Sequence, residues 1–281
     1  MVESKTLTHL VMPFVDTQIL IVRQSLQTWT SQYYPCNSSN YEAQVQLILY
    51  ASFQNLANPN VESASIITSL LSKTLNSSQF KYCFKSWTIA FAKISTLDNS
   101  HHTGSRLMFE KMLSKNISHS APMDYVLYME PDCVPIRHNW LEAVQRNVKE
   151  DPNSFWMKGS VFRGQRAIVN KQPLHLINYF HLNGNAIYSV GDNEFRNFYF
   201  QKVRPFTIEK CKSPKDKYCS VFDTDIFRYL LHNNMEYGAQ YIHHFAFTDL
   251  IQNKWHTNYS THGLLAKSPN TFLVHGGAAL D

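Results

Sequence analysis

Apolar positions along the first half of the chain follow two spacings, one typical of buried strands and one typical of amphipathic helices. Leu10 to Val15 forms a short apolar run, and the next segment repeats its apolar side chains every three or four residues. The same pair of patterns returns from Gln44 to Tyr50, where apolar and polar residues alternate, which predicts a strand with a period of two. The two predicted helices carry their apolar faces on Val22, Leu26, Trp29 and Tyr33, and on Ala64, Ile67, Leu71 and Leu75.

A third strand and a third helix precede the most uniformly apolar short run. Trp87 to Phe91 alternates as a strand, a helix is predicted from about Ser105 to Ser114, and Tyr125 to Met129 is apolar or aromatic throughout. Strands that alternate with helices of this length predict an α/β fold with a mostly parallel, twisted sheet and helices on both faces, as in Rossmann-like proteins. A chain of 281 residues can bury a sizeable core, and we expect a single domain.

Two carboxylates follow the run that ends at Met129. Glu130 and Asp132 flank Pro131, whose ring fixes φ at about −65° and keeps Glu130 extended. Ligands of open α/β sheets bind at the carboxyl ends of the strands, so both side chains are expected at that edge. Converging carboxylates repel each other unless a cation or a proton lies between them, and a hard divalent cation is the simplest answer. The alternative is that Asp132 caps the helix indicated by Asn139 to Val148 while Glu130 is solvated.

The composition narrows the possible partners. The formal net charge is +5, but Lys and Arg are scattered, so no nucleic-acid partner is expected. No apolar run approaches the roughly 18 to 20 residues that span a bilayer, and the first residues lack the apolar core of a signal peptide, so we expect a soluble, cytoplasmic protein without an integral membrane segment. The five cysteines lack CxxC spacing and favour reduced thiols over a zinc site or a disulfide framework, although Cys211 and Cys219 could close a short loop.

The Glu130-Pro131-Asp132 triplet, followed by CVPIRHNWLEAV, resembles the Asp-x-Asp motif and its Glu-x-Asp variants in the nucleotide-sugar glycosyltransferases of the GT-A fold. Other acid-x-acid triplets occur at 192–194 and 223–225, so a triplet alone is not specific. The resemblance rests on the position of this triplet after a buried strand. It covers most of the chain and implies a nucleotide diphosphate sugar as donor, expected to be a UDP-sugar. It also implies Mn²⁺ or Mg²⁺, which would neutralise the charge that develops on the leaving pyrophosphate.

A histidine near the carboxyl end extends this resemblance. LVHGG, residues 273 to 277, ends an apolar run at His275, which is similar in placement to the histidine that completes the metal site in family members. The resemblance therefore implies a metal site of Glu130, Asp132 and His275. A lone histidine is more often structural, and His243 and His244 compete as candidates.

HLNGNAIYS, residues 181 to 189, resembles a Gly-Asn segment on the acceptor side of family members. Asn183 and Asn185 flank Gly184, and amide side chains both donate and accept hydrogen bonds, which suits the hydroxyls of a sugar. These three residues are therefore candidates for substrate binding. The alternative is a plain β-turn that leads into a strand.

VFDTDIFRYL, residues 221 to 230, offers a general base. Transfer with inversion needs a carboxylate that takes the proton of the acceptor hydroxyl as its oxygen attacks the anomeric carbon. Inverting GT-A enzymes often place this base in a Glu-Asp-x-Asp sequence, and Phe222 stands here at the first acid, so Asp223 matches the base and Asp225 the second acid. The alternative is a helix cap followed by an acid that the helix dipole stabilises.

Three residues are candidates for contacts with the donor. Pro13 to Asp16 ends the first strand, where the switch-point rule places the nucleotide base and ribose. Asp16 could accept from a ribose hydroxyl or from uracil, or cap the following helix, and Arg106 could face phosphate or solvent. We expect residues 1–132 to form the nucleotide-binding half of the domain and residues 133–281 the acceptor-binding half.

A weaker resemblance, in length and in the lack of a membrane anchor, is to small glycosyltransferases of large algal DNA viruses, one of which is a xylosyltransferase that builds capsid glycans. The predicted function is metal-dependent, inverting transfer of a sugar from a UDP-sugar, with UDP-xylose as one candidate, to a glycan hydroxyl. Three alternatives stay open. They are a glycosidase with carboxylates roughly 5 to 9.5 Å apart, a phosphoesterase that uses Glu130, Asp132 and His275 around water, and a carbohydrate-binding module built on Asn183 and Asn185.

Overall fold

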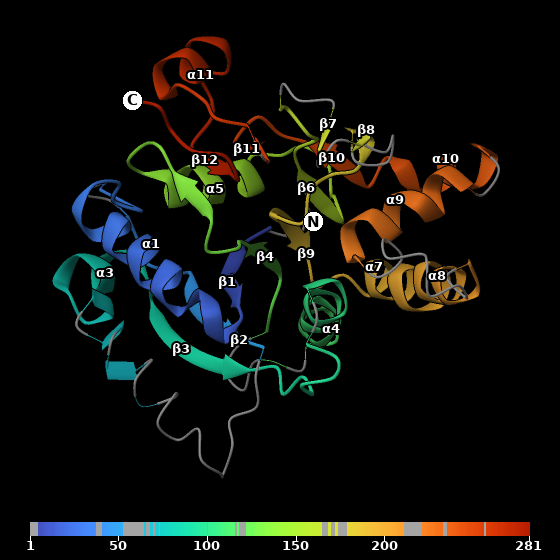
Figure 1. The fold of residues 1–281 in the computed structure, drawn as a ribbon, viewed down its shortest axis with the longest axis horizontal. Coiled ribbons are helices and arrows are strands. Elements are labelled where there is room, and N and C mark those ends of the chain that lie inside the picture. The colour runs from blue at the N-terminus through green and yellow to red at the C-terminus, as the bar shows by residue number, and fades with distance from the viewer. Residues whose placement is uncertain are drawn as a thin grey trace.

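The computed structural model describes residues 5–37, 41–52, 65, 68–69, 71–72, 74–99, 101–115, 117, 122–164, 168–169, 172–173, 179–210, 221–232, 235–255 and 257–281. A sheet of seven strands crosses the molecule (Figure 1). All neighbouring strands in it run parallel, except that one strand, β9, is antiparallel to both of its neighbours. The order is β10 (Phe245–Phe247), β6 (Met157–Gly159), β9 (Ala186–Ser189), β4 (Tyr125–Tyr128), β1 (Leu7–Phe14), β2 (Gln46–Ala51) and β3 (Ser86–Phe91).

Helices cover both faces of this sheet, and each face has its own apolar core. One core joins alternate residues of β1 and β4, such as Leu10 and Leu127, to helices α1 (Ile19–Ser31), α3 (Ser78–Cys83) and α5 (Trp140–Lys149). The other core joins the alternate strand residues, such as Val11 and Val126, to the second set of helices. That set comprises α4 (His101–Leu113), α7 (Asn193–Phe198), the π-helical turn η2 (Tyr199–Val203), α8 (Arg204–Lys210), α9 (Phe222–His232) and α10 (Met235–Ile242).

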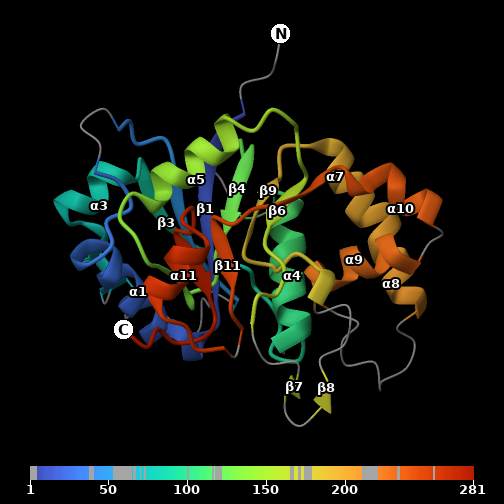
Figure 2. The ribbon, with the colours of Figure 1, turned by 90° about the horizontal axis from the view of Figure 1, so that it is seen from above.

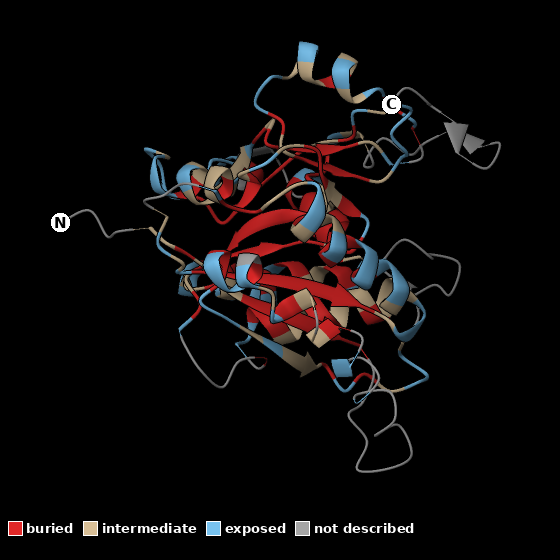
Figure 3. Ribbon diagram, turned by 90° about the vertical axis from the view of Figure 1, so that its left-hand side faces the viewer, coloured by how far each residue is buried: buried red, intermediate tan, exposed pale blue. Residues whose placement is uncertain are grey.

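The figures show the same division. In Figure 2, helices α7, α8, α9 and α10 gather at one side of the molecule and α1 and α3 at the other. Figure 3 shows the central strands as almost wholly buried. The predicted fold class, a mostly parallel α/β sheet with helices on both faces, is confirmed.

A separate sheet of three strands includes β5 (Cys133–Pro135), the strand that follows β4 in the chain. Its strands lie in the order β11 (Ile251–Asn253), β12 (Leu273–His275) and β5, and β12 is antiparallel to β5. The connection from β11 to β12 contains α11 (Thr261–Lys267). A two-stranded ladder of β7 (Ile168–Val169) and β8 (Gln172–Pro173) stands apart. The small sheet brings the carboxyl end of the chain back beside the residues that follow β4.

The predicted strands and helices are present as far as the described residues show, but α1 ends at Ser31, before Tyr33, and one strand differs in burial. The alternation of apolar and polar residues from Gln44 to Tyr50 does not mark a strand with one solvent-exposed face. β2 lies between β1 and β3, and Leu47 through Ala51 are all buried. Alternating exposure is instead found on the edge strand β3. Leu71 and Leu75 are helical and buried as predicted, whereas Ala64 and Ile67 lie outside the described residues.

The prediction that the cysteines stay reduced is wrong for one pair. Cys36 and Cys83, 47 residues apart, form a disulfide that ties the segment after α1 to the end of α3. Their spacing offers no CxxC signal, and only the packing of α1 and α3 on the same face brings the two sulfurs together. Cys133 is a buried free thiol, and Cys211 and Cys219 lie outside the described residues.

Within the described residues, none of the helices combines the length and apolarity that crossing a bilayer requires.

Candidate functional site

The two carboxylates of the predicted motif lie where β4 leaves the sheet. The backbone oxygen of Val11 accepts a hydrogen bond from the N–H of Met129 at 3.0 Å, so alternate residues of β1 face β4. Two residues later Pro13 faces the same way, and it has no N–H with which to continue the ladder. The chain therefore turns away from β1, and Glu130 and Asp132 reach the edge of the sheet with side chains 42% and 51% exposed.

Strand pairing brings His275 to the same point. In the small sheet, β12 runs antiparallel to β5 and pairs His275 with Cys133, the residue after Asp132. The Nε2 atom of His275 lies 3.4 Å from Oε2 of Glu130 and 3.6 Å from Oδ2 of Asp132. One ligand atom from each of the three residues lies within 4.8 Å of the others.

Asn185 holds the Glu130 carboxylate from the other side. Its Oδ1 accepts the backbone N–H of Glu130 at 2.7 Å, and its Nδ2 donates to Oε2 of Glu130 at 2.8 Å and to Oδ1 of Asn183 at 3.0 Å. A backbone N–H can only donate, so the orientation of this amide is fixed. Asn185 is buried, and both ends of its amide are used within the protein.

Asp223 continues the series of hydrogen-bonded residues that includes Glu130 and Asn185. It lies in the first turn of α9. Its Oδ2 accepts the N–H of Gly184 at 2.8 Å and lies 3.5 Å from Nε2 of His181, while its Oδ1 accepts the N–H of Thr224 at 2.7 Å. Burial raises the pKa of Asp223, but His181 and the two N–H donors outweigh burial, so the pKa lies below its usual value. Asp223 is therefore a buried carboxylate held in its ionised form.

Gly184 makes the contact between these two segments possible. A Cβ atom at this position would lie 2.9 Å from the ring of Phe222. The residue also accepts the hydroxyl of Tyr188 on its backbone oxygen at 3.0 Å. Residues 183–185 lead into β9, as the alternative predicted, but with bends at Gly184 and Asn185. The same segment links Asp223 to Glu130 through Gly184 and Asn185.

The side chain of Asp225 lies among a different group of charged residues. Its side chain is fully buried, lies 3.6 Å from Arg204 and 3.7 Å from Arg228, and its two oxygens have no hydrogen-bond partner among the described residues. Burial raises the pKa of Asp225 to about 7, against the opposing effect of the arginines. Arg204 also binds Glu110 at 2.7 Å, and Glu110 binds Arg106 at 2.8 Å.

The remaining predicted residues are placed as follows. Arg106 is largely buried in its pair with Glu110 on α4, and a contact with donor phosphate stays a prediction. Pro13 is buried near the end of β1, whereas Asp16 is exposed in a short 3₁₀ turn, η1 (Asp16–Gln18). Asp16 accepts only the N–H of Thr17 within that turn, so it does not cap α1.

Two alternatives for the motif residues are wrong. Asp132 lies in the turn before β5, and the residue that precedes α5 is Asn139, so Asp132 caps no helix there. The rings of His243 and His244 contact each other at a tilt, and His244 stacks on Trp156, outside the Glu130 cluster.

The two glycines after His275 serve the protein's own backbone. Gly276 and Gly277 have φ of 64° and 79°, and Cβ atoms there would lie 2.9 Å from Cα of Trp255 and 2.1 Å from the backbone oxygen of Thr257. They allow the end of β12 to lie against the turn that follows β11.

The Glu130, Asp132 and His275 side chains suit a hard divalent cation. Two carboxylate oxygens and a ring nitrogen converge, and such a partial set is what Mg²⁺ or Mn²⁺ takes from a protein when substrate oxygens complete the coordination. Partial removal from water and the charges of Asp132 and Asp223 raise the pKa of the half-exposed Glu130, against the effects of His275 and Asn185. A cation between the two carboxylates would remove their mutual repulsion.

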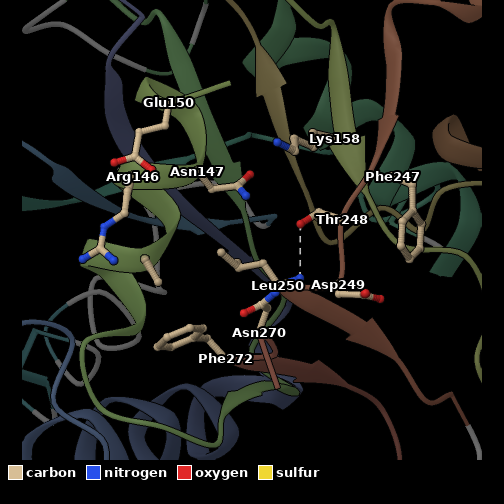
Figure 4. A pocket seen from close by; sticks show the side chains of 11 residues that line it. Arg146, Asn147, Glu150, Lys158, Phe247, Thr248, Asp249, Leu250, Asn270 and Phe272 are labelled. Carbon is tan, nitrogen blue, oxygen red and sulfur yellow. Dashed lines mark hydrogen bonds between the residues drawn. The ribbon is translucent and has the colours of Figure 1, made fainter. Parts of the chain in front are cut away.

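A cavity of about 430 Å³ lies elsewhere and shares no lining residue with this cluster. Figure 4 shows it between α5, Lys158 of β6 and the segment from Phe247 to Leu250. Lys158 is paired with Asp151 at 2.6 Å. Among the described residues, the grouping that could hold a metal ion is the one at Glu130, and it lies outside this cavity.

Two members of the site were not predicted from the sequence. Asn253 lies beside His275, with its Oδ1 3.3 Å from Nδ1, because β11 pairs with β12 in that register. His181 faces Asp223 across the turn of residues 181–184. Neither residue belongs to a local motif, and only knowledge of the strand pairing and the helix packing would have identified them.

Comparison with known proteins identifies the fold. No protein-family model and no curated protein sequence matches the chain. Solved structures do match: mouse xyloside xylosyltransferase 1 in its apo form has a TM-score of 0.53 at 11% identity, over 95% of this chain and 96% of its own. The galactosyltransferase LgtC, solved with donor and acceptor sugar analogues, has a TM-score of 0.51 at 12% identity, over 95% and 86%. The bifunctional glycosyltransferase WbbM matches with 0.51 at 11% identity, over 98% of this chain and 46% of its own. At these identities the likeness establishes the fold, and the chain has the α/β fold of these glycosyltransferases.

Proposed function

We propose that the chain is a glycosyltransferase that moves a sugar from a nucleotide diphosphate donor to a hydroxyl of a glycan acceptor. The observation that carries the proposal is one continuous polar chain at the carboxyl ends of β4 and β12. It runs from Asp223 through Gly184 and Asn185 to Glu130, and from there to Asp132 and His275. The fold shared with the three glycosyltransferases supports the same reaction class.

In this proposal Glu130, Asp132 and His275 hold Mn²⁺ or Mg²⁺. The bound cation supplies charge neutralisation for a diphosphate leaving group. The nucleotide base and ribose lie near Pro13 and Asp16, at the end of β1 next to β4. A UDP-sugar is the proposed donor, and UDP-xylose is one candidate, since one structural neighbour is named a xyloside xylosyltransferase.

Asp223 is the proposed general base, and the transfer proceeds with inversion. The acceptor oxygen forms a bond to the anomeric carbon, its proton passes to Asp223, and the bond to the diphosphate breaks with its electron pair on the leaving oxygen. The lowered pKa keeps Asp223 in the ionised form that a base needs, and it also makes this carboxylate a weaker proton acceptor than one with an ordinary pKa. Asn183 contributes an amide near the acceptor side, while Asn185 holds Glu130.

Thermal unfolding with UDP, GDP or CMP, each with Mn²⁺ or with EDTA, tests the proposal. We expect UDP with Mn²⁺ to stabilise the protein, by about 2.7 kcal/mol at 100 times the dissociation constant, and EDTA to abolish the effect. Asp132→Ala should lose this response while its unfolding without ligand stays close to that of the wild type, because Asp132 is half-exposed.

The other functions give different results in the same assays. Stabilisation by free sugars alone would identify a carbohydrate-binding module. Cleavage of glycosides without nucleotide or metal would identify a glycosidase, and metal-dependent cleavage of simple phosphate esters a phosphoesterase.

A further inference from the structure

The side-chain amide of Asn253 has only one orientation that satisfies its neighbours. Its Oδ1 accepts the backbone N–H of Trp255 at 3.2 Å and lies 3.3 Å from Nδ1 of His275. Rotating the amide by half a turn would place its NH₂ group against the N–H of Trp255. That arrangement leaves a donor unpaired, at a cost of about 1 to 3 kcal/mol where water is excluded. Asn253 is 3% exposed, so the backbone N–H decides which atom faces the histidine.

The fixed amide decides the tautomer of His275 in turn. Because an oxygen faces Nδ1, that ring nitrogen must carry the hydrogen. In the neutral ring, Nε2 then has no hydrogen and presents its lone pair toward Glu130 and Asp132. When both carboxyl groups are ionised, three acceptors thus point at one another, an arrangement that a bound cation satisfies.

The backbone around this pair allows little movement. Asn253 and His275 are paired residues of β11 and β12, and the N–H of Lys254 donates to the oxygen of His275 at 2.8 Å. Gly276 and Gly277, both with positive φ, let the chain lie directly against the backbone of Trp255 and Thr257. His275 is 6% exposed, so water does not replace Asn253 as the partner of Nδ1.

We propose that Asn253 is a positioning residue that holds His275 as the Nδ1–H tautomer and so prepares Nε2 to bind a divalent cation. The metal-binding part of this inference rests on the proposed function, while the tautomer does not. Partners that orient ligand histidines in this way typically contribute 10- to 100-fold to metal affinity.

The tautomer can be measured directly in the metal-free protein. Nitrogen NMR of protein labelled at its histidine rings, with His275→Asn used to assign the signals, should show the hydrogen of His275 on Nδ1 in the neutral ring. In Asn253→Ala, the preference should relax toward the Nε2–H form usual for free imidazole side chains. A wild-type spectrum with the hydrogen on Nε2 would overturn the inference even if the alanine variant did not fold.

Metal affinity supplies the second readout, with Mn²⁺ as the probe, alone and with UDP. Asn253→Ala should weaken Mn²⁺ binding roughly 10- to 100-fold, whereas Asn253→Asp keeps an acceptor oxygen and should stay within about threefold of the wild type. A folded alanine variant with wild-type Mn²⁺ affinity would contradict the positioning role. A wild type with the Nδ1–H tautomer but no Mn²⁺ binding would refute the proposed metal site and support the tautomer alone.

Discussion

Asp223 and Asp225 stand two positions apart in the first turns of α9, yet their surroundings move their pKa values in opposite directions. Asp223 receives N–H donors on both oxygens and faces His181, which stabilises the ionised form. Asp225 is buried without a hydrogen bond among the described residues, and burial dominates over its two arginines. The sequence shows two acids in one triplet, and only the packing of α9 against residues 181–184 and α8 separates their roles.

Asp223→Asn tests the general base. We expect donor and metal binding to persist and turnover to fall by roughly 10² to 10⁴, the usual range for a lost base. The amide can accept on only one side, so one of the two N–H groups now bound to Asp223 loses its partner and stability falls by about 1 to 3 kcal/mol. Steady-state kinetics and urea unfolding measure the two effects separately.

Thr224→Ser is the matched control, because a serine hydroxyl can still donate to the oxygen of Val221. It should keep near-normal turnover. If Asp223→Asn transferred sugar at the wild-type rate, or if the product kept the anomeric configuration of the donor, Asp223 would not be the base of an inverting reaction.

Asp225 gives a prediction for the pH dependence of stability. Its folded pKa of about 7 exceeds the unfolded value of 3.8, so the folded state holds the proton more tightly between these values. The free energy of unfolding should therefore fall as pH rises from about 4 to 7, by up to about 1.4 kcal/mol per pH unit from this group. Asp225→Asn removes this loss.

Urea unfolding of both proteins at pH 5 and pH 8 checks the sign. The stability of Asp225→Asn relative to the wild type should increase from pH 5 to pH 8, while contributions of the other titrating groups largely cancel in the difference. Arg204, Arg228, Arg106 and Asp223 all act on this carboxylate. A relative stability that does not change between pH 5 and pH 8 would mean that the arginines dominate and hold Asp225 ionised throughout this range.

At the scale of elements, the long strands and amphipathic helices could be predicted, whereas the three-residue strands β5, β6 and β11 could not. β1, β3, β4, α4 and α5 are long or apolar enough for their periodicity to show. β5, β6 and β11 have three residues each, too few for any period, and they exist because they pair with neighbours. The motif at Glu130 was readable because it follows a buried strand, whereas Asn253 depends on the register of β11 and β12.

Gly277→Ala should separate the ends of those two strands. Its φ of 79° disfavours any side chain, and a Cβ would lie 2.1 Å from the oxygen of Thr257. The left-handed conformation alone costs about 1 to 2 kcal/mol, and displacing the backbone of Thr257 adds to that. We expect lower stability in urea unfolding and weaker Mn²⁺ binding, because Asn253 and His275 move apart.

Gly263→Ala provides a control of opposite sign. This glycine lies in α11, and a Cβ there makes only ordinary contacts, 3.5 Å or more from Ser260. Alanine should therefore stabilise the protein by about 0.4 to 1 kcal/mol. If Gly277→Ala and Gly263→Ala changed the stability equally and only slightly, the close approach of the backbone at Gly277 would not be needed for stability.

At the scale of the whole molecule, the candidate site depends on contacts between parts of the chain that are far apart in sequence. Glu130 and Asp132 come from the middle of the chain, Asp223 from a helix on one face, and His275 from the last strand. The proposed division into halves at residue 132 therefore runs through the cluster itself. Alternating strands and helices were enough to predict the layers, but not the return of β12 beside β5.

The Cys36–Cys83 disulfide acts at this same scale, because it closes a loop of 47 residues that includes β2. In the chain-entropy model, a cross-link of this length stabilises the folded state by about 4 kcal/mol, since it restricts the unfolded chain. Replacing both cysteines by alanine should therefore lower the midpoint of urea unfolding substantially. The wild type should show a similar loss in a thiol reductant, and the double variant should not respond further at these positions.

If the reductant still destabilised the double variant, that effect would report on Cys211 and Cys219. The double variant is therefore the control for the effect of the reductant on the wild type. The folded proteins should also differ in thiol content, with Cys36 and Cys83 unreactive in the oxidised wild type until reductant is added. Two results together would show that this pair is not joined. The wild-type unfolding curves would coincide with and without reductant, and the unfolded protein would have two additional reactive thiols before reduction. In that case the packing of α1 against α3 alone, through Trp29, Phe80 and Phe84, would hold the segment after α1 in place.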